Sequence, residues 1–528
     1  MAYRGTLLRD LTSGQALTPI YIAQGFSLGT YLSFGYASET IFTLYGCASH
    51  SGMGLDDTID PDSVSLMGAS LTPGTWESTI GGFSFSVIDP SAFRGDWVRG
   101  SLIALKMGFN IKDPAAFDTV AVGVLSNISR NPDGVSWTIN CMDIVSALKS
   151  RHTTTMSALP LFTNAGTETT LAVAYTVTDT TLDLASATDF EINSNGSGTG
   201  VVKVTPDSGD DFYLTYTGIT SNQLTGVSAA GQFGTTAGAA GIGNAAIAVV
   251  YLSGHPLDIV RKIITSTGSA SNGGHDTEAA SWGYALPQEI LDRDDIADYE
   301  SQVVKVASGS YTWSVLVEAP IDNGFSWMAD LLKPAGIFLA MRQGELTVRA
   351  VQNPEGKTAN LYLANYEITD DDIIEIEAHD HYDASVPVEF GEVDFTTATG
   401  TTTKSENSPA TVATLPAQKT TTYDLSTVVF DNESETRTEW AARLRLWALR
   451  VPERLTVRCH LYMMQATVGD VVLLTTNQTQ GRSSDTADGF VEHEVMVTQW
   501  DVQLPTDGGE PSVTLVLSVL PSSSQRDP

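Results

Sequence analysis

Apolar and polar side chains alternate along much of this chain, and the alternation predicts a protein built mainly from β-strands. Residues 83–88 read Phe-Ser-Phe-Ser-Val-Ile and stop at Asp89-Pro90, which is the period of a strand with one buried face. Residues 132–134, Pro-Asp-Gly, predict a hairpin turn. Other strands of the N-terminal region are predicted at residues 100–105, 120–125 and 135–139. Their spacing favours an up-and-down barrel or a sandwich within residues 1–150.

Residues 166–250 form a block rich in Thr, Gly and Ala that is nearly free of Lys and Arg. Inside it, residues 212–218 and 219–226 alternate Thr with apolar or aromatic side chains, and each run stops at Gly. This pattern predicts a small all-β unit of short strands joined by tight turns. Helical spacing resumes at residues 257–264, with Pro256 in a favourable first-turn position. We therefore predict that the small unit is inserted between two pieces of one domain.

A helical period appears at few other places in the chain. The spacing predicts a short helix over residues 143–149 with Asp143 as its cap, and another over 325–332 ended by Pro334. The clearest helix is predicted at residues 435–450, where apolar side chains recur at i, i+4, i+7 and i+11 before the stop at Pro452. These side chains are Trp440, Leu444, Trp447 and Val451.

The rest of the C-terminal half is predicted to be strands and loops. Residues 337–349 predict a hairpin around Gln343-Gly344, and the Thr- and Ser-rich residues 396–422 predict an exposed loop or linker. A strand pair joined by a turn is expected at residues 455–462 and 468–474. Two further strands are expected at residues 491–504 and 512–520.

Charge narrows the choice of partners. The chain has 62 acidic residues against 28 basic ones, which gives a formal net charge of −34 over 528 residues. A surface this negative repels phosphate, so sequence-specific binding of DNA or RNA is not expected. No run reaches the roughly 20 apolar residues that span a bilayer. The three cysteines, Cys47, Cys141 and Cys459, lie far apart and are expected to be buried thiols.

The densest group of metal-ligand side chains lies at residues 379–383. His379, Asp380, His381 and Asp383 could hold a divalent cation if both histidines lay on one strand face. The alternative is a polar strand end or loop, and we favour it because no further residues at ligand spacing lie nearby. We therefore predict no metal and no cofactor, and leave open whether these four residues bind a metal.

Catalytic motifs are missing from the sequence. Residues 238–243 resemble a phosphate-binding loop only in composition, because they lack the required order of glycines, and we predict a turn within the insert. Glu375 and Glu377 alternate with Ile on a predicted strand and so mark its solvent face. A catalytic pair of carboxylates for sugar hydrolysis could still be formed by two residues that lie far apart in the sequence. We predict no catalytic residues and a protein that is not an enzyme.

Arginines gather in the predicted helix 435–450 and the strand that follows it. A nucleic-acid patch is conceivable there. Pairing with acidic neighbours, in this chain or in a packed copy, fits the overall charge better. The arginines are Arg437, Arg443, Arg445, Arg450, Arg454 and Arg458.

Taken together, several of these segments resemble hub or minor tail proteins of long-tailed bacteriophages, a family related in fold to the baseplate hub of contractile tails. Residues 214–220 with 224–227 are similar to small β modules of tailed-phage structural proteins. The segments that resemble the first barrel of tail hubs are residues 100–105, 123–128 and 137–143. Those that resemble the rest of the family are residues 253–260, 321–349, and the Arg-rich helix followed by 468–472.

The resemblance implies a mainly β fold with two hub-type β-barrel domains, a small inserted β domain and a mixed α+β middle domain. In chain order these are residues 1–150 with 251–265 (first barrel), 166–250 (insert), 266–395 (middle domain) and 423–528 (second barrel, with helix 435–450). Because the insert would block a conduit if it pointed inward, we expect it on the outside.

The resemblance also implies a homotrimer at the distal end of the tail tube, in the virion, after assembly in the bacterial host cytoplasm. Three subunits with two barrels each would present a pseudo-sixfold ring to the tube. The expected neighbours are the distal tail or tail tube protein, the C-terminus of the tape-measure protein, and tail fibre or spike proteins. An acidic lining would let DNA leave through the ring during ejection without sticking.

Two other functions stay open from the sequence. A host-surface adhesin could use residues 166–250 to bind a receptor glycan, and this role could coexist with a hub. A tail-associated cell-wall hydrolase is the other alternative, and the missing catalytic motifs count against it.

Overall fold

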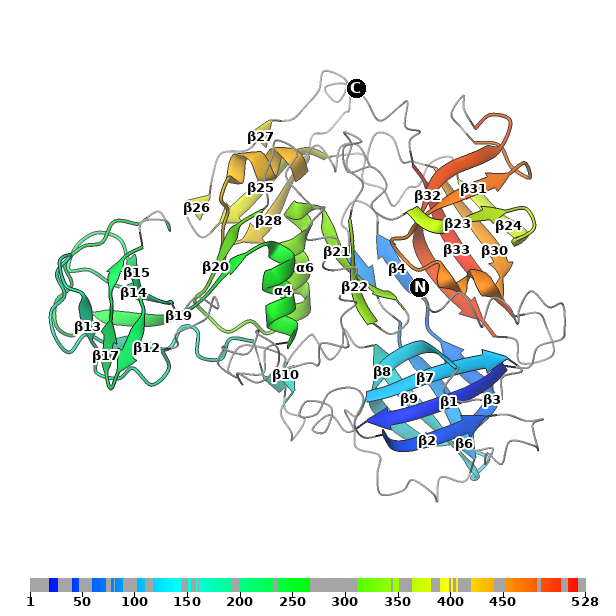
Figure 1. Ribbon diagram of the computed structural model, residues 1–528, viewed down its shortest axis with the longest axis horizontal. Coiled ribbons are helices and arrows are strands. Elements are labelled where there is room, and N and C mark those ends of the chain that lie inside the picture. Colours follow the sequence, from blue (N-terminus) through cyan, green and yellow to red (C-terminus); the bar gives the residue numbers. More distant parts are fainter. Residues whose placement is uncertain are drawn as a thin grey trace.

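The computed structural model confirms a mainly β protein and arranges it as four units (Figure 1). Two barrels stack on one another, a unit with helices lies beside them, and a small β unit lies at the far end. The structure describes residues 19–26, 40–46, 59–72, 77–79, 81–88, 102–109, 117–143, 151–152, 158–159, 161–190, 199–230, 233, 235–265, 311–342, 345–350, 363–380, 390–397, 400–401, 405–406, 419–440, 453–481, 486–504 and 511–520.

The first barrel is a seven-stranded antiparallel sheet in the order β2-β1-β7-β8-β9-β6-β3. Strand β3 also contacts β1 and β2, so the sheet is nearly closed. The alternating pattern predicted β6, β7, β8 and β9, and the 132–134 turn lies between β8 and β9, with Gly134 at a φ of 72°. The strands are β1 (Pro19–Phe26), β2 (Thr40–Gly46), β3 (Ile59–Leu66), β6 (Phe83–Ile88), β7 (Leu102–Phe109), β8 (Asp118–Arg130) and β9 (Ser136–Asp143).

The second barrel has the strand order β23-β31-β32-β33-β30-β24. Its two outermost strands, β23 and β24, follow one another in the chain and are joined by a turn at residues 370–372, so the sheet curls toward closure. The predicted strand pair at 455–462 and 468–474 is wrong in one respect. These strands share the sheet, but β32 and β33 lie between them, because residues 461–465 form a 3-10 helix that carries the chain across. The strands are β23 (Leu363–Thr369), β24 (Ile373–Asp380), β30 (Arg454–His460), β31 (Val471–Thr476), β32 (Phe490–Gln503) and β33 (Ser512–Val519).

A hairpin from the first barrel joins the two barrels. Strands β4 (Ala69–Thr72) and β5 (Glu77–Thr79) lie between β3 and β6 in the sequence. Yet β4 pairs with β32 of the second barrel, with Ser70 opposite Gln499. Apolar residues of both barrels also form one buried cluster, which runs from Tyr21 and Phe83 to Leu515. The two barrels are therefore joined by a sheet as well as by packing.

The central unit packs helices α4 (Pro256–Thr265) and α6 (Gly324–Leu332) against strands. Both helices and the 337–349 hairpin confirm the sequence predictions, the hairpin as β21 (Ile337–Arg342) and β22 (Glu345–Ala350). Helix α4 contacts α6 and lines a small apolar cavity with the hairpin. We grouped residues 251–265 with the first barrel. In the structure they lie with the middle segment, because α6 and the hairpin cover the apolar face of α4.

The Thr-rich segment 396–422 differs from its sequence prediction. Residues 396–422 were predicted as a loop, but β28 (Lys419–Leu425) pairs in parallel with β25 (Phe390–Thr397), and the short strands β26 (Gly400–Thr401) and β27 (Ser405–Glu406) pair with β25 as well. Thr is β-branched and suits a strand.

Asp143 ends strand β9, and residues 144–149 lie outside the described part. The predicted helix 435–450 is described over 433–440.

The insert is an all-β unit, as predicted, with its own buried cluster. A three-stranded sheet, β13-β17-β16, packs beside a larger one in the order β18-β15-β14-β19, in which β12 pairs with β19 as well. Strand β19 continues beyond the insert and pairs with β20 (Trp313–Val317) of the central unit. The insert strands are β12 (Glu168–Thr170), β13 (Thr181–Asp183), β14 (Gly200–Val204), β15 (Phe212–Tyr216), β16 (Gly218–Thr220), β17 (Gln223–Thr225), β18 (Ser228–Ala229) and β19 (Ala245–Gly254).

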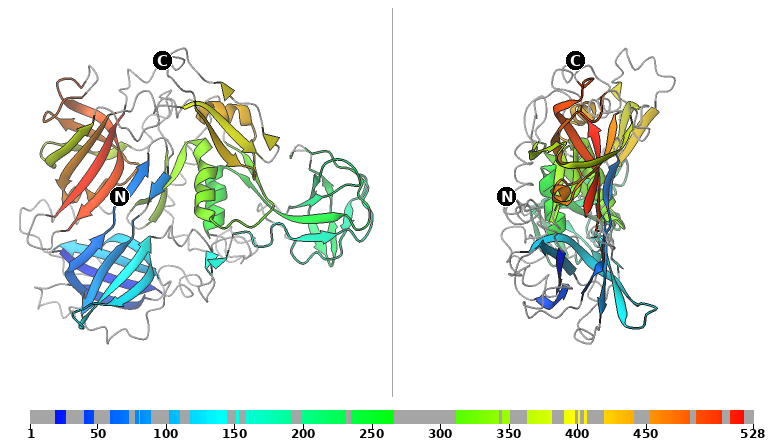
Figure 2. Two further views of the ribbon diagram at one scale, coloured as in Figure 1. Left: turned by 180° about the vertical axis from the view of Figure 1, so that it is seen from behind. Right: turned by 90° about the vertical axis from the view of Figure 1, so that its right-hand side faces the viewer.

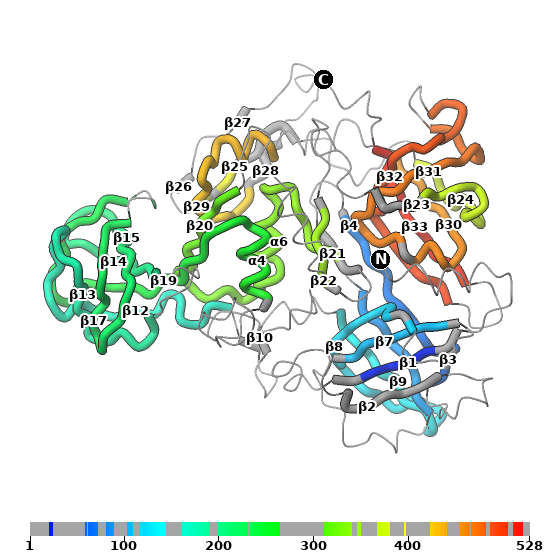
Figure 3. Tube along the Cα trace, in the orientation of Figure 1, coloured from blue at the N-terminus to red at the C-terminus, as the bar shows by residue number. Residues whose placement is uncertain are grey.

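The four units lie side by side in a flat molecule. Figure 2 shows the narrow dimension edge-on, and Figure 3 traces β19 from the insert into the central unit. The insert is at the opposite end from the barrels in each broad view. In the described part of the chain, no helix has the length and apolar character needed to cross a membrane.

Candidate functional site

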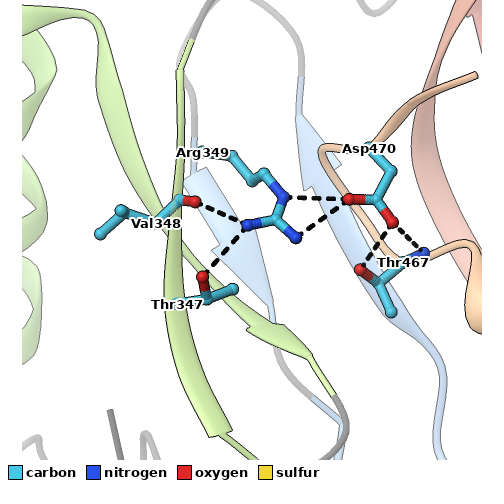
Figure 4. A network of polar contacts seen from close by, with 5 residues as sticks. All are labelled: Thr347, Val348, Arg349, Thr467 and Asp470. Carbon is cyan, nitrogen blue, oxygen red and sulfur yellow. Dashed lines mark hydrogen bonds and ion pairs between the residues drawn. The ribbon is translucent and has the colours of Figure 1, made fainter. Parts of the chain in front are cut away.

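Two groups of polar side chains lie at junctions between units. One such junction joins the β21–β22 hairpin to the second barrel through Arg349 and Asp470 (Figure 4). Arg349 is 1% exposed, and its Nε donates to Asp470 Oδ1 at 3.0 Å, while Nη2 lies 3.0 Å from the same oxygen. Its Nη1 donates to Thr347 Oγ1 at 3.1 Å and to the carbonyl of Val348 at 2.8 Å. The guanidinium is thus held from both sides.

Asp470 is fixed in turn by the loop before β31. Its Oδ2 accepts from Thr467 N at 2.9 Å and from Thr467 Oγ1 at 3.1 Å. Gly469 has a φ of +90°, and a Cβ at that position would lie 2.7 Å from Arg349 Cγ and 2.8 Å from Phe338 Cζ. Glycine is therefore needed both for the backbone and for the approach of the hairpin. The geometry holds two units in one orientation and presents no reactive group to solvent.

A second junction lies where the insert meets the central unit. Strand β19 crosses it without interruption, with Val249 paired to Val201 of the insert and Val250 paired to Val317 of β20. Glu318, just after β20, accepts from Lys203 Nζ at 2.7 Å and from the hydroxyl of Tyr213. Burial and the Glu318 carboxylate raise the pKa of Tyr213, so its hydroxyl stays protonated and donates.

Apolar packing reinforces this junction. A buried cluster combines side chains from the insert with side chains from the central unit. The ring of Phe233 lies edge-on to Tyr213, with centroids 5.7 Å apart, and to Tyr251, with centroids 5.3 Å apart. Such edge-to-face pairs add to the stabilisation from burial. Because a strand, a polar network and an apolar cluster all cross the junction, the insert is held as a rigid arm.

His379 is the described histidine of the 379–383 cluster. It lies on β24, with Nδ1 2.6 Å from Thr479 Oγ1 and Nε2 2.7 Å from Glu453 Oε1. Both ring nitrogens are therefore used within the barrel. Asp380 ends the strand, and His381 and Asp383 lie outside the described residues. Within the described part of the chain, no three His, Cys, Asp or Glu side chains are grouped to hold a metal.

The arginine cluster is described at three of its six positions. Arg458 Nη2 lies 2.9 Å from Glu375 Oε2 of the neighbouring strand, as expected from pairing with acidic neighbours. Glu375 and Glu377 are both exposed, which confirms that they mark the solvent face of β24. Arg437 is buried at 7% exposure, and Arg454 pairs in register with Asp380 on β24. Arg443, Arg445 and Arg450 lie outside the described residues.

The other sequence candidates are structural. Residues 238–243 form a loop of the insert in which Gly243 has a φ of 88°. Cys141 and Cys459 are buried free thiols as expected, and Cys47 lies outside the described residues. Burial, with a smaller effect of Asp372, raises the pKa of Cys459 to about 12. A thiol with this pKa is inert at neutral pH.

The junction residues were not identified from the sequence. Arg349 carried a weak signal, because it continues the strand pattern of residues 345–350 into a buried position. Gly469 and Asp470 lie in the predicted strand 468–474, and nothing in that pattern marks them as junction residues. Glu318 and Lys203 are 115 positions apart, and no local pattern links them.

No protein-family model matches the chain, and no curated protein matches it by sequence. Among solved structures, the chain is similar to a 43 kDa tail protein of prophage MuSo2 from Shewanella oneidensis, at 8% identity and a TM-score of 0.37, over 95% of this chain and 99% of that one. It is similar to the prophage tail protein gp18 from Listeria monocytogenes at 10% identity and a TM-score of 0.36, over 95% and 94%.

A third similar structure is an E. coli component of the type VI secretion system, whose description notes similarity to the T4 bacteriophage tail proteins gp27 and gp5. It is 10% identical, with a TM-score of 0.31, over 89% of this chain and 76% of that one. These three structures are thus described as tail proteins or as similar to tail proteins.

Proposed function

We propose that this chain is a structural protein of a phage tail and forms the hub at the distal end of the tail tube. The observation that carries the proposal is the pair of β-barrels in one chain, joined by the β4–β5 hairpin and by a common buried cluster. A hub needs two ring-forming barrels per subunit in a fixed relative orientation, and this junction supplies that orientation.

In this proposal three copies form a closed ring of six barrels, which matches a hexameric tube. Open sheet edges tend to pair with other strands, and closure of a ring covers them. The tube protein and the tape-measure C-terminus bind on one side of the ring, and fibre or spike proteins bind on the other. The charge of −34 supports a lining that DNA passes without binding.

Electron microscopy of the purified chain tests the proposal. We expect a threefold ring with an axial channel, and analytical ultracentrifugation should give the mass of three chains of 56.2 kDa. A compact monomer at all concentrations and in the presence of the tube protein would overturn it. The control is a variant with Lys at an outward position of the insert, Thr217→Lys, which should leave the ring intact.

A further inference from the structure

The insert carries a group of exposed aliphatic side chains that its fold does not use. They are Val173, Val177 and Ile242, with exposed fractions of 53%, 59% and 71%. We call these three residues the aliphatic patch. Single exposed apolar side chains are common on protein surfaces, but contiguous ones mark contact sites.

Backbone pairing brings the patch together. Tyr175 and Ala240 form a bridge in which each N–H donates to the carbonyl of the other. Four residues away, Leu171 N donates to Asn244 O at 2.9 Å, and Gly243 N donates to Leu171 O at 2.9 Å. The two segments therefore run side by side. Between these contacts lie Val173 on one segment and Ile242 on the other, Ile242 within a turn in which Asn244 N donates to Gly241 O at 3.2 Å, and Val177 follows two residues after the bridge.

Carboxylates flank the patch. Asp179 Oδ2 accepts from Thr176 N at 2.7 Å, next to Val177. Asp207 Oδ1 accepts from Gly241 N at 2.8 Å and from Asn244 Nδ2 at 3.0 Å, next to Ile242. The donors that hold both carboxylates are neutral, so these bonds leave the negative charge in place.

The insert supplies no base to neutralise this charge. Lys203 is the only Lys or Arg in residues 166–250. Its Nζ lies 2.7 Å from Glu318 and 3.6 Å from Asp211, so it is engaged at the junction with the central unit. The patch therefore combines apolar area with a negative rim that no Lys or Arg of the insert neutralises, which suits a partner that carries basic groups.

We propose that this face of the insert docks a partner protein through a segment of apolar side chains flanked by Lys or Arg. Apolar contact at the centre and charge pairing at the rim is the usual anatomy of a protein interface. The rigid junction of the insert keeps the patch in a fixed direction, which lowers the entropy lost on binding. This inference goes beyond the hub proposal and holds for the isolated chain whether or not the ring forms.

Fluorescent peptides test the inference on the full chain. The probes are a peptide of alternating Leu and Lys, one in which Ser replaces Leu, and one in which Glu replaces Lys. We expect the Leu–Lys peptide to bind most tightly and to weaken with added salt. The triple variant V173S/V177S/I242S should weaken this binding by about tenfold or more.

The matched control is I88S/V135S/V491S, which removes three exposed aliphatic side chains from the barrels. It should leave the affinity unchanged, and circular dichroism should show both triple variants folded. If the Ser–Lys peptide bound as tightly as the Leu–Lys peptide, binding would depend on charge alone, and the proposal would be overturned. It would also be overturned if the control weakened binding as much as the patch variant, if salt had no effect, or if the Leu–Lys peptide did not bind.

Discussion

At the scale of single residues, Arg349 shows how two units are held in one orientation. Its guanidinium is almost fully buried, and a buried charge is tolerated only when it is paired and hydrogen-bonded. Asp470 supplies the charge, and Thr347 and Val348 supply the remaining acceptors (Figure 4). The pair therefore holds the hairpin against the barrel in one geometry, because displacement of either residue would break this buried ion pair.

Replacing Arg349 by Met should be strongly destabilising. Asp470, 6% exposed, would lose its buried ion pair with Arg349, which costs about 3–5 kcal/mol. Urea denaturation measures the change in the free energy of unfolding. R349M/D470N should recover part of the loss, because Asn keeps the acceptor for Thr467 without the charge. The control is Arg458→Met, which removes an exposed ion pair and should cost less than about 1 kcal/mol. An equal loss in both single variants would contradict the interpretation.

The ion pairs of Asp258 in helix α4 should make the stability of the fold depend on pH. Burial alone would raise the pKa of its carboxyl, but pairing with Lys262 and Arg261 outweighs burial and lowers it. The folded-state pKa is therefore below the unfolded value of about 3.9. The carboxylate stabilises the fold above that unfolded value, and its contribution is lost as pH falls through the folded pKa.

Asp258→Asn tests this dependence. We expect the variant to be less stable than the wild type at pH 7 and the gap to shrink at pH 3, measured by urea denaturation at each pH. Asp210→Asn, at an exposed bend of the insert, is the reference for carboxylates outside the helix. A gap for Asp258→Asn that is the same at both pH values would refute the role of the ion pairs.

At the scale of elements, the sequence predicted what is local. Strand β6, helices α4 and α6 and the β21–β22 hairpin follow from alternation, Pro256 and the Gln343-Gly344 turn, because each is decided by neighbouring residues. The partner of β4 could not be predicted, since Ser70 and Gln499 are joined only by the final fold. The junction residues Arg349, Asp470 and Glu318 could not be predicted for the same reason. The Thr-rich β28 was mistaken for a loop because its strand lacks a clear apolar period.

The β4–β5 hairpin should be the element that fixes the barrels to one another. Leu71 on β4 is 3% exposed and belongs to the buried cluster of the central unit. Leu71→Ala should cost about 2–5 kcal/mol and should speed amide hydrogen exchange in β4 and in the part of β32 beside it. Met67→Ala, at 56% exposure just before the hairpin, is the control and should change neither. Unchanged exchange in β32 in the Leu71 variant would contradict the joining role.

At the scale of the whole molecule, the insert is an arm with a defined point of attachment. Gly166 N donates to Ala248 O at 2.9 Å, and Ala248 N donates to Thr167 O at 2.9 Å. The chain therefore enters and leaves the insert at neighbouring positions. The buried cluster of the insert lies entirely beyond this point.

Joining Gly166 directly to Val249, with residues 167–248 removed, should leave the barrels and the central unit folded. Small-angle scattering should show a shorter maximum dimension, because the insert forms one end of the molecule (Figure 1). Removal exposes Leu316 and Val429, which lose their cover from the insert, so we expect a modest loss of stability of about 1–3 kcal/mol. Loss of folded barrels by near-ultraviolet circular dichroism would show that the insert is an integral part of the core.

The pairing of β4 with β32 also has a consequence for how the protein is made. Ser70 leaves the ribosome about 430 residues before Gln499. At a synthesis rate of about 5–20 residues per second, this interval is roughly 20–90 s. During that time the hairpin of the nascent chain has no partner strand and is open to pairing with other chains. The N-terminal barrel can close early, but the molecule acquires its final form only after release of the C-terminus, so chaperone protection matters most in this window.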